Sequence, residues 1–246
     1  MNRIVATLAL LAWTAAYAAA AEAPQTPNIV FCIADDASCH FGAYGCTWAK
    51  TPNIDALAKR GLVFDNVYTP TAKCAPSRAA ILTGRNPWQL EEAANHQCHF
   101  PAKFKVVTEA LADAGFYVGA QGKFWGPGDA KTADGQQRKW GLASSGGESQ
   151  QNDDGKKFRE FLAARPAGKP FFFWFGSTNP HRPYKPDSGV EAGKKPGDIE
   201  HVPAYWPDND VVRRDMLDYS IEIELYDTQV GSVLRALEES GEADNT

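Results

Sequence analysis

The most informative stretch of the chain reads Cys74-Ala75-Pro76-Ser77-Arg78-Ala79-Ala80-Ile81-Leu82-Thr83-Gly84-Arg85. Proline suits the first turn of a helix, because a helix makes no use of that N–H. The residues after Pro76 form helices readily, and Gly84 is a typical helix stop. The stretch therefore predicts a helix that presents Cys74 at its N-terminus, where free N–H groups favour negative charge, with Arg78 one turn further on. A structural cysteine at a helix start is the alternative that position alone leaves open.

Apolar runs on both sides of this stretch predict a sheet. Residues 28–34 form a near-continuous apolar run, which is typical of a buried strand, and Asp35 and Asp36 follow it directly. Similar patterns predict strands over 62–68, 116–120 and 171–175, and helices over 52–59, 107–114 and 156–164. Strands that alternate with helices favour an α/β fold with a mostly parallel central sheet flanked by helices on both faces.

The last predicted helix is the clearest. Asp210 is expected to cap it, apolar residues recur at spacings of three and four from Val212 to Leu237, and Gly241 ends it. The segment 85–104 is expected to be irregular, 126–154 to be a surface loop, and the proline-rich segment 183–208 to be a loop beside the active site.

Four elements that carry reactive or charged side chains follow strands or begin a helix. They are Asp35 with Asp36, Cys74 with Arg78, Lys123, and His181. Because the carboxyl ends of parallel strands meet at one edge of a sheet, we expect them to lie together. Paired carboxylates suit a hard divalent cation such as calcium or magnesium. Taken singly, each has an ordinary alternative: a capping acid, a solvated lysine or a loop histidine.

The string Cys-x-Pro-Ser-Arg-x-x-x-Leu-Thr-Gly resembles the signature of the type I sulfatases, in the alkaline-phosphatase-like superfamily. Asp35-Asp36 is similar to the metal-binding acid pair of that family, Gly122-Lys123-Phe124-Trp125-Gly126 to its Gly-Lys-x-His element, and Asn179-Pro180-His181-Arg182 to its later histidine motif. Shorter strings are similar to heparan N-sulfatase (sulfamidase)-like and bacterial sulfatases: Gly42-Ala43-Tyr44, His99-Phe100, Pro180-His181-Arg182 and residues 227–231.

The resemblance implies that a formylglycine-generating or equivalent sulfatase-maturing enzyme oxidises Cys74 to Cα-formylglycine. In the hydrate, one hydroxyl attacks sulfur, and the other loses its proton so that sulfate is expelled. The implied catalytic residues are Cys74, Arg78, Lys123 and His181; Lys123, His181 and Arg182 bind substrate; Asp35, Asp36 and Cys74 bind calcium, or magnesium. The implied reaction is cleavage of a sulfuric ester in a sulfated carbohydrate.

Two departures from the family pattern lead to further expectations. Trp125 stands where the family has a histidine, a role that His96 or His99 would have to take over. The chain ends at residues 243–246, where the next strand of the family begins. Residues 24–246 are therefore expected to be the N-terminal portion of a catalytic domain whose C-terminal part, with further metal ligands, is missing.

The N-terminus and the composition bear on location and partners. Residues 1–20 resemble a signal peptide, with Arg3, an apolar stretch over 4–16 and three alanines at 18–20. A buried or membrane-anchoring helix is the alternative, although the stretch is short for a span, and no later segment is apolar enough to cross a membrane. The mature protein is thus expected to be exported, either periplasmic or secreted. A net charge of −5 argues against a nucleic-acid partner.

The cysteines fit the same expectation. Besides Cys74 the chain has four, an even number that suits an oxidising compartment, and no C-x-x-C pair that would favour structural zinc: Cys32, Cys39, Cys46 and Cys98. Three other functions stay open: N-sulfoglucosamine sulfohydrolase-like activity, a phosphodiesterase or phosphonate hydrolase of the same superfamily, and an inactive fragment that at most binds sulfated glycans.

Overall fold

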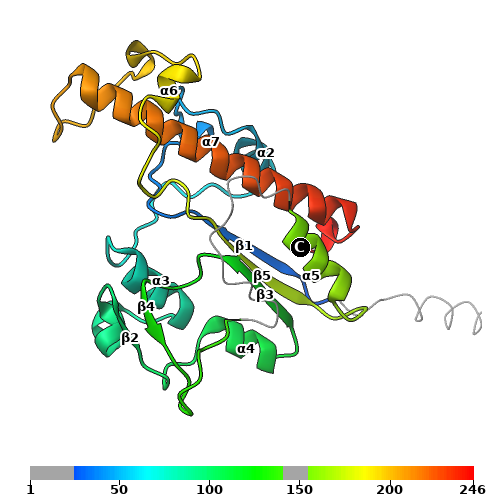
Figure 1. The fold of residues 1–246 in the computed structure, drawn as a ribbon. Helices are drawn as coiled ribbons and strands as arrows, with labels where there is room; N and C mark the ends of the chain where they lie inside the picture. Colours follow the sequence, from blue (N-terminus) through cyan, green and yellow to red (C-terminus); the bar gives the residue numbers. More distant parts are fainter. Residues whose placement is uncertain (1–24, 141–154) are drawn as a thin grey trace, which may run out of the picture.

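The computed structural model describes residues 25–140 and 155–246 (Figure 1). The predicted signal peptide and much of the predicted loop 126–154 lie outside the described residues. The elements that bear on the site are the helices α2 (Pro52–Arg60), α3 (Cys74–Thr83), α4 (Val107–Asp113), α5 (Lys156–Ala164), α6 (Ser188–Glu191) and α7 (Asp210–Glu239), and the strands β1 (Ile29–Ile33), β2 (Cys98–Phe100), β3 (Tyr117–Gly122), β4 (Gly128–Ala130) and β5 (Phe171–Gly176).

The central sheet of the described residues has three strands in the order β1-β5-β3, and both pairs are parallel. In register, Ile29 of β1 lies opposite Phe172 of β5, and Phe172 lies opposite Val118 of β3. All three strands therefore end at the same edge of the sheet. The predicted α/β class with a mostly parallel sheet is confirmed.

The apolar run of β5 supplies the cores on both faces of the sheet. Phe172 and Trp174 belong to a core that includes Ala79 and Leu82 of α3, whereas Phe171, Phe173 and Phe175 belong to a core formed with α5 and α7. Figure 1 shows α3 and α4 on one side of the sheet, with α5 and α7 on the other. Alternation of side chains along a strand explains why every residue of β5 is buried.

Two predicted segments differ from the structure in minor ways. The segment 85–104, expected to be irregular, contains β2, which pairs in parallel with β4 inside the expected loop 126–154. The segment 183–208, expected to be a loop, contains the short helix α6.

The predicted cap of α7 is wrong by one residue. The side chain of Asn209, not Asp210, accepts a hydrogen bond from the Val212 amide at 3.0 Å.

The predicted strand 62–68 is wrong: the structure has no strand there. Its apolar side chains are exposed, with Leu62 at 85% and Tyr68 at 84%. β-branched and aromatic residues favour a strand only where a neighbouring strand pairs with them, and no described strand lies beside this segment. Within the described residues, no helix combines the length and apolarity that a membrane span requires.

Candidate active site

Asp35 lies at the centre of the candidate site. It follows β1, is 3% exposed, and donates its backbone N–H to the Asn179 carbonyl oxygen at 3.0 Å. Its Oδ1 accepts a hydrogen bond from Arg78 at 3.2 Å, and its Oδ2 accepts one from the Lys123 ammonium. A buried carboxylate is costly unless it is paired. Here two cations from different elements neutralise it.

Arg78 ties three parts of the chain together. Its guanidinium is almost fully buried and, besides Asp35, donates to the Lys123 carbonyl oxygen at 2.8 Å and to the Ala34 carbonyl oxygen at 3.2 Å. These acceptors follow β3 and β1, and Arg78 itself comes from α3. The planar fork of arginine suits several acceptors at fixed angles. The predicted convergence of Asp35, Arg78 and Lys123 at the carboxyl edge of the sheet is confirmed by this geometry.

Cys74 is the first residue of α3, and its side chain is half-buried. The preceding residue, Lys73, provides no side-chain cap, so the first turn of α3 keeps free N–H groups. Side chains four residues apart share a helix face, which directs Cys74 and Arg78 to the same side of α3. Gly84, in the left-handed conformation at φ 65°, ends the helix as predicted.

Gly176 allows the ends of β3 and β5 to approach each other closely, a role that the sequence interpretation missed. The Lys123 amide donates to the Gly176 carbonyl oxygen at 2.8 Å, and the Trp174 indole N–H donates to the Lys123 carbonyl oxygen at 3.2 Å. A Cβ on Gly176 would lie 1.8 Å from that same oxygen. A glycine at the end of a buried strand was the available signal.

A buried polar network fixes the segment that carries His181. Ser177 donates its hydroxyl to Gln229 Oε1 at 2.7 Å, and Gln229 Nε2 donates to Asn179 Oδ1 at 3.0 Å. Asn179 Nδ2 also donates to Glu222. Burial raises the pKa of the Glu222 carboxyl above its ordinary value, and the hydrogen bond from Asn179 opposes this shift. Gln229 and Glu222 belong to α7, so this helix positions the loop after β5.

His181 and Arg182 point to different partners. The Nε2 of His181 lies 3.6 Å from Asp36 Oδ2, and its Nδ1 lies 2.6 Å from the Arg182 carbonyl oxygen. Asp36 has φ 62°, a conformation that few non-glycine residues adopt. Arg182 instead forms a pair with Asp215 of α7. The catalytic and substrate-binding roles of these residues stay predictions.

Trp125 does not occupy the site in place of the expected histidine. Its ring packs against Phe100 at 5.2 Å and Trp140 at 6.3 Å between centroids, beside the core under α3. His99 lies on β2, with its Nδ1 3.8 Å from Asp129 Oδ2. In the described part of the chain, neither His99 nor His96 forms a hydrogen bond or ion pair with Asp35, Arg78 or Lys123, and their substitution for the missing histidine stays a prediction.

The residues present do not by themselves fit a calcium ion. Calcium takes six to eight oxygen ligands. Among the described residues, no group of three or more histidine, cysteine, aspartate or glutamate side chains is arranged to hold a metal. Asp35 already accepts hydrogen bonds from Arg78 and Lys123, and Asp36 faces His181. The cysteines of the described ranges are all unpaired.

The family-like string at 227–231 is structural. Asp227 of α7 accepts hydrogen bonds from the amides of Asn53 at 3.2 Å and Ile54 at 2.8 Å, so it caps α2. A Cβ on Gly231 would lie 2.4 Å from the Asn53 side chain. Asp227 and Gly231 are four residues apart in α7, and this spacing places both on the helix face that contacts Asn53 of α2.

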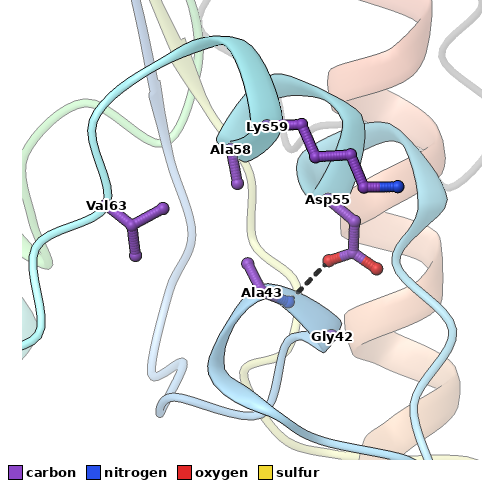
Figure 2. Close-up of a pocket in the computed structure, with 6 residues that line it drawn as sticks. All are labelled: Gly42, Ala43, Asp55, Ala58, Lys59 and Val63. Atoms are coloured by element: carbon purple, nitrogen blue, oxygen red, sulfur yellow. Dashed lines mark hydrogen bonds between the residues drawn. The ribbon is translucent and has the colours of Figure 1, made fainter.

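A separate surface pocket of about 330 Å³ lies between α2 and the turn at Gly42. Figure 2 shows the Asp55 carboxylate turned toward the Ala43 amide, which donates to it at 2.8 Å. Lys59 and Val63 lie on its rim, and none of the predicted site residues lines it. This pocket is therefore distinct from the candidate active site.

Comparisons with known proteins identify the family of the chain. The model of the family described as Sulfatase matches residues 27–246. The ulvan-active sulfatase of Formosa agariphila is 26% identical over 91% of this chain and 42% of its own length. Human arylsulfatase A is 38% identical over 44% of this chain and 23% of its own length. The chain thus spans less than half the length of these curated relatives.

Solved structures share the fold. A protein crystallised with its substrate D-glucosamine-2-N,6-O-disulfate aligns with a TM-score of 0.65 at 20% identity, over 90% of this chain and 64% of the other. The phosphonate monoester hydrolase of Agrobacterium radiobacter aligns with a TM-score of 0.60 at 18% identity, over 89% of this chain and 61% of the other. Because the family model covers nearly all of the described residues, the chain belongs to the sulfatase family.

Proposed function

We propose that this protein hydrolyses a sulfuric ester of a sulfated carbohydrate. The observation that carries the proposal is the convergence of Arg78 and Lys123 on Asp35 at the carboxyl edge of the sheet, beside the N-terminus of α3 that bears Cys74. A sulfate group needs cationic donors on several oxygens, and a helix N-terminus adds free N–H groups. Membership of the sulfatase family supports the same reaction.

Each residue has a proposed task. Cys74 is the position that a maturing enzyme oxidises to formylglycine, which supplies the nucleophilic hydroxyl when hydrated. Lys123 is 18% exposed, so its ammonium can reach both Asp35 and an entering anion, whereas Arg78 is buried and orients Lys123 and Asp35. His181, which is 45% exposed next to Asp36, is placed to protonate a leaving oxygen. Arg182, whose side chain is 57% exposed, is proposed to bind substrate, as the resemblance implies.

The divalent cation enters the proposal in a limited way. Asp35, Asp36 and Cys74 would supply part of a calcium or magnesium shell, as the resemblance implies, but no group of three or more histidine, cysteine, aspartate or glutamate side chains among the described residues is arranged to hold a metal. The proposed activity rests on Cys74, Lys123 and His181.

Export to the periplasm or the medium is proposed from residues 1–20, which resemble a signal peptide.

Phosphonate or phosphodiester hydrolysis is a second candidate, and likeness to the Agrobacterium radiobacter phosphonate monoester hydrolase motivates it. N-sulfoglucosamine hydrolysis is a third, supported by the fold shared with the protein crystallised with D-glucosamine-2-N,6-O-disulfate. All three use an anionic group held by the same cations. Sulfate esters and N-sulfates are both attacked at sulfur and differ in the leaving atom, oxygen or nitrogen, whereas phosphonate esters and phosphodiesters are attacked at phosphorus. Turnover of matched substrates therefore separates the three.

The test is hydrolysis of matched substrates by the chain co-expressed with a formylglycine-generating enzyme. We expect 4-nitrophenyl sulfate to be cleaved, with activity falling to background in Cys74→Ala and by at least about tenfold in Lys123→Gln, which removes the ammonium but keeps a donor. A matched control is Lys59→Gln, on the rim of the separate pocket. Cleavage of a phenyl phosphonate ester but not of any sulfate ester or N-sulfate, or equal activity in Cys74→Ala, would refute the proposal.

A further inference from the structure

Arg182 and Tyr184, which follow His181, form a preorganised polar and aromatic surface. The guanidinium of Arg182 lies 4.3 Å from the centroid of the Tyr184 ring. The same group forms a two-pronged pair with Asp215 of α7, with one N–H···O distance of 2.8 Å. The Arg182 and Asp215 side chains stay 57% and 36% exposed. The stacking and the pair fix the arginine plane without removing it from solvent.

The ring of Tyr219, in α7, packs against Tyr184. Its ring centroid is 6.0 Å from that of Tyr184, and its hydroxyl accepts a hydrogen bond from the Ser38 amide at 3.1 Å. Burial raises the pKa of Tyr219 to about 12, so the phenol stays neutral in ordinary buffers. The segment after Asp36 and the segment after His181 thus share one aromatic support.

The surface lies next to the candidate active site. His181, the neighbour of Arg182 in sequence, faces Asp36 at 3.6 Å. Burial raises the pKa of Tyr184, Arg182 opposes that shift, and the negative charges of Asp215 and Asp36 add to it. Tyr184 also packs against Tyr219, whose hydroxyl binds the amide of Ser38, two residues after Asp36. Since His181 is proposed to protonate the leaving oxygen, the sugar attached to that oxygen would lie on the side of the site where Arg182 and Tyr184 follow His181.

We propose that Arg182, Asp215 and Tyr184 bind the uncharged, hydroxyl-bearing part of the sugar whose sulfate enters the site. This inference rests on the proposed function. The Arg182–Asp215 pair carries no net charge, and two of the five guanidinium N–H groups face Asp215, so others remain to donate to a sugar oxygen. The carboxylate can accept from a neighbouring hydroxyl, and the Tyr184 ring offers apolar area to the C–H face of the ring. Asp215 and Asp36 would repel a second sulfate.

The test measures binding, so that its outcome does not depend on turnover. Isothermal titration of the full chain uses N-acetylglucosamine 6-sulfate, N-acetylgalactosamine 6-sulfate and inorganic sulfate as probes. We expect at least one sulfated sugar to bind about tenfold more tightly than inorganic sulfate, and Tyr184→Ala to weaken that sugar about tenfold while leaving inorganic sulfate unchanged. Asp215→Asn, which keeps the shape but removes the charge, should weaken the sugar without weakening inorganic sulfate.

Tyr205→Ala removes an aromatic ring that is 80% exposed and is separated from Tyr184 in the chain by α6, and it should change neither affinity. Tyr184→Phe keeps the ring and should bind the sugar nearly as wild type does, which shows that folding is intact. The inference is overturned if neither sugar binds more tightly than sulfate, or if Tyr184→Ala weakens both probes equally. If the wild-type chain does not hydrolyse any sulfate ester, that result would count against the proposed function and not against this inference.

Discussion

The replacement Arg78→Met tests the buried charge cluster directly. Methionine keeps the apolar stem of arginine, so the main loss is the guanidinium. That loss removes the donors to the Lys123 carbonyl oxygen at 2.8 Å and the Ala34 carbonyl oxygen at 3.2 Å, and one of the two cations that neutralise Asp35. Lys123 remains beside Asp35, and the Trp174 indole N–H still donates a hydrogen bond to the Lys123 carbonyl oxygen.

The expected cost follows from these contacts. Removing one partner of a buried ion pair costs about 3–5 kcal/mol. For a chain of this size, 1 kcal/mol shifts the melting temperature by about 2–4 °C, so Arg78→Met should melt roughly 6–20 °C below wild type. Urea unfolding followed by tryptophan fluorescence gives the free energy of unfolding.

A matched control separates burial from the loss of charge. Arg182→Met removes the same group from a pair with Asp215 that is 57% and 36% exposed, and should cost at most about 1 kcal/mol. The reasoning is refuted if Arg78→Met unfolds within about 1 kcal/mol of wild type, or if the two variants lose the same free energy.

Four further predictions concern packing, capping, pH and metal. Gly176→Ala places a Cβ 1.8 Å from the Lys123 carbonyl oxygen and should lose more than about 3 kcal/mol of unfolding free energy, whereas Gly197→Ala, with no atom within 4 Å, should be nearly neutral; equal stability of the two would contradict the close approach. Asp227→Ala removes the cap of α2 and should cost about 0.5–2 kcal/mol by urea unfolding, with a smaller cost for Asp227→Asn; no difference between these variants would argue against capping. Burial raises the Glu222 pKa in the folded state, so the contribution of this carboxyl to the unfolding free energy falls as pH rises through that pKa. The stability of Glu222→Gln relative to wild type should therefore grow with pH, and a constant difference across pH would contradict this. Calcium should shift the melting temperature of the chain by less than about 1 °C in differential scanning calorimetry, and tight binding by calorimetric titration would contradict the incomplete ligand set.

Local patterns predicted the parts of the site that local forces determine. Pro76 and Gly84 mark the limits of α3 almost to the residue, and the acids after the apolar run 28–34 lie at a strand end as expected. Because parallel strands share a direction, Asp35 and Lys123 could be placed at one edge before their contact was seen.

Long-range partners were beyond such patterns. The segment 62–68 has strand-forming residues but no strand beside it among the described residues, so propensity alone misled. Nothing in the sequence near Arg182 indicates that Asp215 of α7 would bind it. The same applies to Gln229 and Asn179, whose contact depends on how α7 lies across the sheet.

Mass spectrometry of the tryptic peptide Cys74–Arg78 tests the central claim most directly. The chain would be co-expressed with a formylglycine-generating enzyme, and the unmodified chain would serve as the mass reference. The account predicts the loss of mass that accompanies replacement of the Cys74 thiol by an aldehyde. Recovery of only the intact thiol would contradict the sulfatase mechanism proposed for this site.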